Sequence, residues 1–157
     1  MADVEHSALT GSDLHEPKGV ASASANSVYV ADGAASGAQT VINNLNRIAL
    51  NCTLVDIDND ASAWVVSPVA GDIVAIYSVI DGAIATADAG ITTEIGGVAV
   101  TGGDITITQA SSAAGDIDSA TPTANNAVGA GQAIEFVNDL AATNAVTVTF
   151  TVWIDVS

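Results

Sequence analysis

The chain has 157 residues, the length of one domain or of one domain with a flexible extension. Hydrophobic residues make up 49% of it but aromatic residues only 4%, so a core must consist mainly of Val, Ile, Ala and some Leu. Eighteen acidic residues face two basic ones, Lys18 and Arg47, which gives a formal net charge of −16. Nucleic-acid backbones and anionic membrane surfaces both require clustered Lys and Arg, so we expect neither as a partner.

Residues 1–39 are predicted to form an extended N-terminal arm. They are rich in Ala, Ser, Gly, Asp and Asn and contain few large apolar residues. Such a segment buries too little surface to offset the entropy of ordering its backbone, so we expect it to become ordered where it meets a partner. Within the arm, residues 27–31 followed by Asp32-Gly33 predict one added strand. Residues 39–46 are the one plausible helical piece, a turn or two long.

Residues 40–157 read as a succession of short strands. Gly96-Gly97 predicts a two-residue hairpin turn. Residues 72–80 are apolar on both faces, as in a strand that is covered on both sides, whereas residues 110–131 are small and polar and predict a loop. The strands are predicted at residues 47–57, 63–67, 72–80, 91–95, 98–100, 104–108, 132–138 and 145–155. This spacing predicts an all-β fold, a single β-sandwich of jelly-roll or immunoglobulin-like type.

The last predicted strand alternates most clearly. One face holds Val146, Val148, Phe150, Val152 and Ile154, and the other holds Thr147, Thr149, Thr151 and Trp153. Strict alternation predicts a half-buried strand. A large aromatic residue on the outward face is typical of subunit contacts, so Trp153 is a candidate partner-binding residue. The alternative is that Trp153 folds over the edge of the sheet or packs under the arm.

Cys52 is the single cysteine, so an intrachain disulfide is impossible. It lies in an apolar stretch with few basic groups in the whole chain, which predicts a small buried hydrophobic side chain and not a reactive thiol. The first residues lack the cationic and apolar regions of a secretory signal, and no stretch approaches the length of a membrane span. These features predict synthesis in a cytoplasm.

Three aspartates, Asp56, Asp58 and Asp60, resemble the start of a calcium-binding loop. An EF-hand needs Gly at the sixth position and Glu at the twelfth, where this chain has Ala61 and Ser67. An EF-hand is therefore excluded. A looser calcium site and an acidic turn at the end of a strand remain as alternatives, and we favour the turn.

Other groups that suggest chemistry are isolated. Asp116 and Asp118 form a carboxylate pair, but a glycosidase also needs a sugar groove, usually lined by aromatic residues, and this chain has few. His6 and His15 supply too few ligands for a metal site. Nucleophile-elbow and phosphate-binding glycine motifs are missing from the sequence. The sequence therefore predicts a protein that is not an enzyme and that uses no cofactor and no metal.

Two stretches of the arm carry a resemblance to known proteins. Residues 6–19 (HSALTGSDLHEPKG) and 28–33 (VYVADG) resemble an N-terminal segment that recurs in tailed-phage virion proteins, mostly capsid decoration (cement) proteins and head or tail fibre proteins. Blocks of the body resemble the same group, at residues 76–84 with 87–89, 95–103 and 112–123.

The resemblance implies a virion structural protein on the capsid exterior. A decoration protein binds the outer surface of the shell of major capsid protein and stabilises it. The resemblance also implies a homo-oligomer, for which a trimer is the expected number. Because the chain ends after one sandwich, decoration is favoured over the alternative, a head or tail fibre or adhesion module that binds a host-surface glycan.

Nine residues are predicted to contact partners, eight of them in the arm. They are Leu9, Leu14, His15, Pro17, Lys18, Val28, Tyr29, Val30 and Trp153. The predicted strand of the arm is suited to adding to a sheet edge of a capsid protein or of a sister subunit. Many weak contacts repeated by symmetry would then combine through effective concentration.

Overall fold

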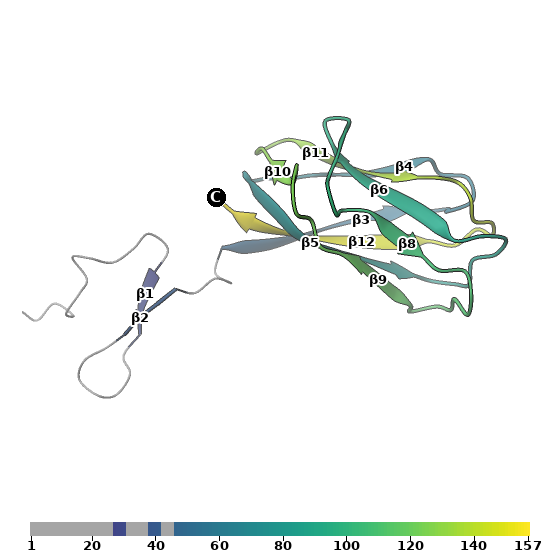
Figure 1. Ribbon diagram of the computed structural model, residues 1–157, viewed down its shortest axis with the longest axis horizontal. Helices are drawn as coiled ribbons and strands as arrows, with labels where there is room; N and C mark the ends of the chain where they lie inside the picture. The colour runs from purple at the N-terminus through teal and green to yellow at the C-terminus, as the bar shows by residue number, and fades with distance from the viewer. Residues whose placement is uncertain (1–26, 31–37, 42–45) are drawn as a thin grey trace, which may run out of the picture. The chain divides into compact units, whose positions relative to one another are not determined.

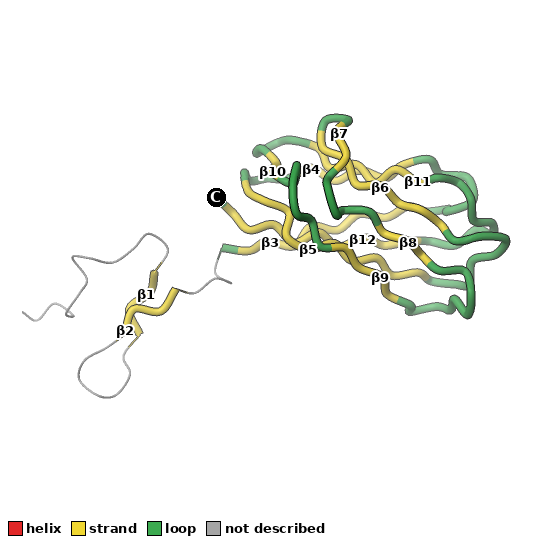
Figure 2. The backbone as a smooth tube through the Cα atoms, in the orientation of Figure 1, coloured by secondary structure: helices red, strands yellow, loops and turns green. Residues whose placement is uncertain are grey.

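A computed structural model describes residues 27–30, 38–41 and 46–157, and the chain divides into two compact units, residues 1–46 and 47–157. Every element of the described residues is a strand, and Figure 2 shows no helix among them. No helix of the described part is long and apolar enough to cross a membrane. The predicted all-β class is confirmed.

The first unit contains a two-stranded antiparallel sheet, β1 (Ser27–Val30) and β2 (Ala38–Val41). Strand β1 confirms the strand predicted at residues 27–31. Strand β2 shows that the helical prediction for residues 39–46 is wrong at residues 39–41, which pair with β1. The physical reason is that Thr and Val favour extended backbone, and a helix of one or two turns is not stable by itself. The Asp32-Gly33 turn lies outside the described residues.

The second unit is a sandwich of two five-stranded antiparallel sheets, drawn as two layers in Figure 1. The β12 sheet has the order β10-β5-β12-β3, with β9 also paired to β5. Its strands are β3 (Arg47–Leu54), β5 (Gly71–Ile80), β9 (Ile117–Ala120), β10 (Ala127–Val128) and β12 (Val148–Val156). The predicted β-sandwich is therefore confirmed.

The β11 sheet forms the other layer, with the order β4-β11-β6-β7 and β8 paired to β6. Its strands are β4 (Ser62–Val66), β6 (Ala89–Ile95), β7 (Val98–Ala99), β8 (Ile105–Ile107) and β11 (Ala133–Asn138). The predicted hairpin is confirmed, because Ile95 lies opposite Val98 and both Gly96 and Gly97 have positive φ angles, 61° and 78°. Positive φ is readily adopted by glycine, which explains the pair at this turn.

Two details of the strand prediction are wrong. Residues 110–131 are not all loop, because β9 and β10 both pair with β5. Strand β9 lacks the usual alternation, because apolar Ile117 is exposed and Asp118 is partly buried, and β10 has only two residues. Residues 72–80 are not covered on both sides: Ile76 and Ile80 are buried, whereas Tyr77 and Val79 are 42% and 37% exposed. The β12 sheet therefore has one face in the core and one outer face.

The core between the layers is rich in isoleucine and contains one aromatic pair. The rings of Phe136 on β11 and Phe150 on β12 stack with centroids 4.3 Å apart, so they join the two sheets. The alternation predicted for the last strand is confirmed, because all five of its apolar positions are buried. Buried polar groups are mostly paired, as expected: Thr93 Oγ1 donates to the Gly103 carbonyl at 2.7 Å, and Asn138 Nδ2 donates to the Ile57 carbonyl at 2.7 Å.

Candidate functional site

The outer face of the β12 sheet carries a patch of uncharged side chains. Residues directly opposite each other on antiparallel strands point to the same face, so strand pairing arranges them in rows. The three rows are Ala49–Trp153–Ala75, then Asn51–Thr151–Tyr77–Ser119, then Thr53–Thr149–Val79–Ile117. We call these eleven residues the uncharged face. None of them is acidic or basic, although residues 47–157 hold thirteen acidic residues.

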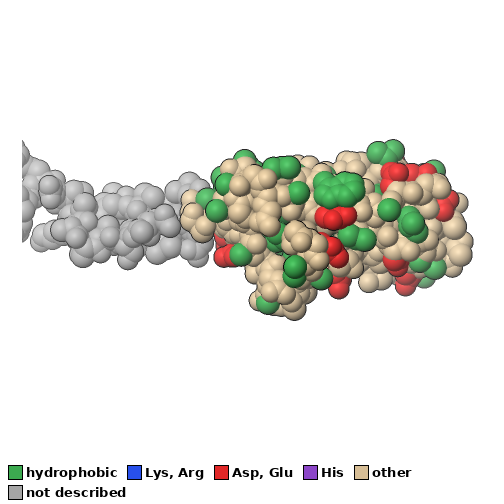
Figure 3. All heavy atoms as spheres, turned by 90° about the horizontal axis from the view of Figure 1, so that it is seen from above, with side chains coloured by type: hydrophobic (Ala, Val, Ile, Leu, Met, Phe, Trp, Pro, Cys, Tyr) green, Lys and Arg blue, Asp and Glu red, His purple; other side chains and the backbone are tan. Residues whose placement is uncertain are grey.

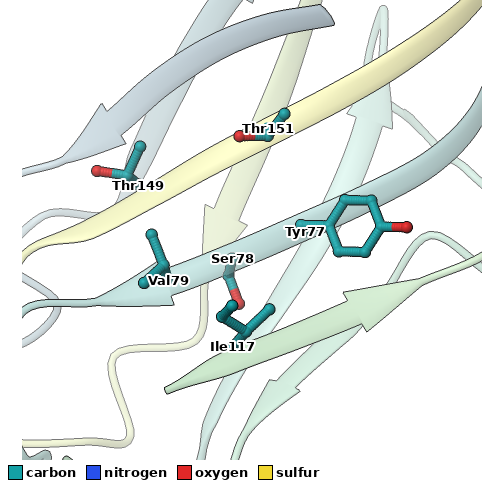
Figure 4. Close-up of a pocket in the computed structure, with 6 residues that line it drawn as sticks. All are labelled: Tyr77, Ser78, Val79, Ile117, Thr149 and Thr151. Carbon is teal, nitrogen blue, oxygen red and sulfur yellow. The ribbon is translucent and has the colours of Figure 1, made fainter. Parts of the chain in front are cut away.

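Large apolar side chains of this face are open to solvent. Ile117 is 67% exposed, Tyr77 42%, Trp153 38% and Val79 37%. Beside three of them, Tyr77, Val79 and Ile117, lies a shallow pocket of about 210 Å³, to which β5, β9 and β12 all contribute (Figure 4). Its lining consists of Tyr77, Ser78, Val79, Ile117, Thr149 and Thr151.

Alternation in the sequence explains why this face is both uncharged and partly polar. Buried Val148, Phe150 and Val152 of β12 are each followed by an outward Thr or by Trp153, and β-branched Thr suits an exposed strand position. Thr151 Oγ1 donates a hydrogen bond to Asn51 Oδ1 at 2.7 Å, which ties β12 to β3. The prediction that Trp153 lies on the outward face is confirmed, and its contact with a partner stays a prediction.

Charged residues border the uncharged face at one end. Arg47 pairs with Asp155 through Nε and, at 3.1 Å, through Nη2. This hydrogen bonding raises the pKa of the Arg47 guanidinium and lowers the pKa of the Asp155 carboxyl. The pair is neutral as a whole. At the other end, the Asp81 carboxylate accepts a hydrogen bond from the Thr147 N–H at 2.8 Å.

Three of the eight predicted partner-binding residues of the arm lie in a described strand. Val28, Tyr29 and Val30 lie in β1, opposite Thr40, Gln39 and Ala38. The others lie outside the described residues, as does His6: Leu9, Leu14, His15, Pro17 and Lys18. Their contacts stay predictions.

The aspartates after β3 close a turn. Asp56 Oδ1 accepts from the Asp58 N–H at 3.0 Å, and Asp60 Oδ2 accepts from the Asp56 N–H at 3.0 Å. Asp56 Oδ2 also accepts from Asn59 Nδ2 at 2.9 Å. Within residues 46–157 no group of three His, Cys, Asp or Glu side chains is placed to hold a metal ion. The geometry favours the acidic turn, in which Asp side chains bond nearby backbone.

The carboxylate pair lies beside a small polar pocket of about 190 Å³. Asp116 Oδ2 accepts from the Ala113 N–H at 2.7 Å, so this carboxylate closes a loop. Asp118 lies on β9, and burial, together with the charge of Asp116, raises its pKa. None of the residues lining the pocket is aromatic. The pocket therefore lacks the stacking surface on which a glycosidase usually holds a sugar.

Cys52 packs against the core from β3 and is half-buried. Burial raises the pKa of its thiol to about 11, so the thiol is protonated at neutral pH. This environment suits the predicted packing role and not a nucleophile, although the residue is less buried than expected.

Sequence reasoning missed Trp64 as a surface residue. It is 58% exposed on the outer face of the β11 sheet, opposite Glu135 and two positions from Val66, which is 57% exposed. The alternation within residues 63–67 could have predicted this exposure, because Ala63 and Val65 point inward and Trp64 and Val66 therefore point outward. Figure 3, which views the molecule from above Figure 1, shows acidic side chains among hydrophobic ones. This face therefore differs from the uncharged face.

Comparison with known proteins found no relative of this chain. No family model, no curated protein and no solved structure matches the chain.

Proposed function

We propose that this protein is a non-enzymatic virion structural protein that decorates the capsid of a tailed phage. In this proposal it binds the outer surface of the shell of major capsid protein and stabilises the shell. The observation that carries it is the uncharged face, which fits contact with another protein. The phage context comes from the resemblance of the arm.

The composition of the uncharged face is that of a protein interface. Interface cores are depleted of charged residues and enriched in aromatic ones, and aromatic anchors carry much of the binding energy. Tyr77 and Trp153 are such residues, and both lie on strands held by neighbours on either side. Because pairing on both sides already fixes the backbone of these strands, binding requires no further ordering of that backbone.

The size of the face argues for repeated weak contacts. Four strands about 4.8 Å apart, each contributing about five residues at 3.3 Å per residue, cover roughly 300 Å². A stable protein complex buries about 800 Å² on each partner. One uncharged face is therefore too small for tight binding, and firm attachment needs a second contact. Several copies joined to one another, or an arm that binds as well, supply it through effective concentration.

Co-sedimentation with capsids that lack this protein tests the proposal. The full-length chain is expected to bind at a saturating ratio and to raise the temperature at which the capsids break. Val79→Glu places a charge in the uncharged face and is expected to weaken binding at least about tenfold, or 1.4 kcal/mol. The matched control is Val98→Glu on β7, since Val98 is 56% exposed and lies in the other sheet.

Two results would contradict the proposal. If the wild-type chain does not sediment with capsids, the protein is not a decoration protein for them. If Val79→Glu and Val98→Glu both bind like the wild type while their circular dichroism spectra are unchanged, the uncharged face is not the contact.

The second candidate is an adhesion module that binds a host-surface glycan, and Trp64 favours it. An exposed indole beside a carboxylate resembles a sugar-stacking surface, and Glu135 lies opposite Trp64 in the sheet. Binding of the purified chain to a glycan array, lost in Trp64→Ala and kept in Val79→Glu, would support adhesion over decoration. An array without any binding would remove this candidate.

A further inference from the structure

The outer face of the β11 sheet carries two large apolar side chains that are open to solvent. Trp64 and Val66, two positions apart on β4, are 58% and 57% exposed. Covering apolar surface of this kind is favourable, and aromatic side chains are enriched where one protein contacts another. The side chains beside Trp64 then decide which partner chemistry this surface suits.

Strand pairing places Trp64 at one end of a row of outward side chains. Trp64 lies opposite Glu135 of β11, and Glu135 lies opposite Glu94 of β6. Side chains at directly opposite positions point to the same face and have Cβ atoms about 5 Å apart. We call Trp64, Glu135 and Glu94 the acidic row. Its indole and its two carboxylates are therefore within reach of one long partner side chain.

The two carboxylates of the acidic row repel each other without compensation. Glu94 and Glu135 are the only glutamates of residues 46–157, and like charges directly opposite each other destabilise a strand pair. Neither side chain has a hydrogen-bond or ion-pair partner among the described residues. Figure 3 shows no described Lys or Arg side chain on this side. A pair that is locally unfavourable in this way is typical of a functional site.

We infer that the acidic row, with Val66 beside it, binds an arginine side chain of a partner protein. A guanidinium is planar, stacks on an indole and donates paired hydrogen bonds to carboxylates, so it matches every member of the row. Its positive charge also offsets the repulsion between Glu94 and Glu135, which a neutral sugar stacked on Trp64 would leave in place. Val66 adds apolar contact for the stem of the arginine.

Charge also decides where this arginine comes from. The net charge of −16 attracts a basic protein surface and opposes the approach of a second copy of the chain. A second copy has no free arginine to offer, because Arg47 is the only one in the sequence and it pairs with Asp155. The inference does not depend on the decoration function, and it concerns the sheet opposite the uncharged face.

Nuclear magnetic resonance of the full-length chain tests this with the peptide acetyl-Gly-Arg-Gly-amide. The two indole N–H signals, assigned with Trp64→Phe and Trp153→Phe, report on the two sheets separately. The Trp64 signal is expected to shift and to saturate with a Kd of about 1–10 mM, as for a few exposed contacts, while the Trp153 signal stays in place. The same peptide with citrulline, which has nearly the shape of arginine without its charge, is expected to shift neither signal.

Glu135→Gln keeps the size of the side chain and removes the charge beside Trp64. It is expected to weaken binding of the arginine peptide about fivefold, whereas Asp72→Asn, which removes one charge from β5 in the other sheet, should bind like the wild type. Because Glu135→Gln relieves the repulsion, its midpoint of urea unfolding should be at or above that of the wild type.

Four results would overturn the inference. They are an unmoved Trp64 signal, an equal shift with the citrulline peptide, an equal loss of affinity in Asp72→Asn, and binding of array glycans at Trp64 without binding of the arginine peptide. The two peptides act on the unmodified protein, so they decide the matter even if a variant fails to fold. Because capsids are not needed, failure of the decoration proposal would leave this result standing.

Discussion

Ser78→Ala is expected to stabilise the protein. The side chain of Ser78 is 1% exposed and points into the core opposite Phe150, and its hydroxyl has no hydrogen-bond partner in the described part of the chain. A buried polar group without a partner costs about 1–3 kcal/mol. Removing one oxygen loses little packing, so the substitution should recover the lower end of that range, about 1 kcal/mol.

The same substitution at Ser67 is the matched control. Ser67 is 0% exposed, but its hydroxyl donates to the Val69 carbonyl at 2.7 Å. Ser67→Ala removes this hydrogen bond and leaves the Val69 carbonyl without its donor, so we expect the free energy of unfolding to fall by about 1 kcal/mol. Two buried serines should therefore respond to one substitution with opposite signs.

Urea unfolding at fixed protein concentration measures the effect of both substitutions on stability. With a slope of about 2 kcal/mol per molar urea, Ser78→Ala should raise the midpoint by about 0.5 M and Ser67→Ala should lower it by a similar amount. If Ser78→Ala lowers the midpoint by 0.5 M or more, a fixed partner such as an ordered water satisfies the hydroxyl and the reasoning is wrong. A change in the slope would mean that the unfolded or native state, and not the hydroxyl, was altered.

Three further predictions concern the core, the carboxylate pair and the thiol. Phe150→Ala removes a fully buried ring stacked on Phe136 and should destabilise the fold by about 3–5 kcal/mol in the same urea assay, where a loss below about 1 kcal/mol would contradict the stacked core. The pKa of Asp118 is raised in the folded protein, so ionisation of its carboxyl lowers stability as the pH rises above the ordinary pKa of 3.8. The melting temperature of Asp118→Asn should therefore be higher than that of the wild type at pH 7 and equal to it near pH 3. Equal melting temperatures at both pH values would refute this. Since the pKa of Cys52 rises from 9.0 to about 11, alkylation at pH 8 should be about a hundredfold slower in the folded protein than in urea, and equal rates would show an open thiol.

Prediction of the fold from sequence succeeded where alternation was strict. In β12 every inward position is a large apolar residue and two of the four outward positions are Thr, so period and burial agree. It failed at β9, where apolar Ile117 points outward and Asp118 is partly buried, and at β10, which has only two residues; pairing with β5 imposes the extended shape of both. Short edge strands take their structure from a neighbour, and that neighbour is not visible in the local sequence.

The candidate site was predicted only in part. Trp153 could be placed outward from its own strand. Tyr77 and Val79 were assigned to a strand covered on both sides, because apolar residues on both faces of a strand do not reveal whether a second layer is present. Ile117 fell in a predicted loop. The uncharged face forms because pairing brings four strands into register, and three of them are more than twenty residues apart in the chain.

Composition and period by themselves determined that this chain is an acidic, all-β protein with an Ile- and Val-rich core, because side-chain alternation and charge are local properties of the sequence. The tertiary structure decided which outward residues become neighbours and which serine loses its partner. Those outcomes depend on strand order, and strand order is set by contacts between residues as distant as Arg47 and Asp155.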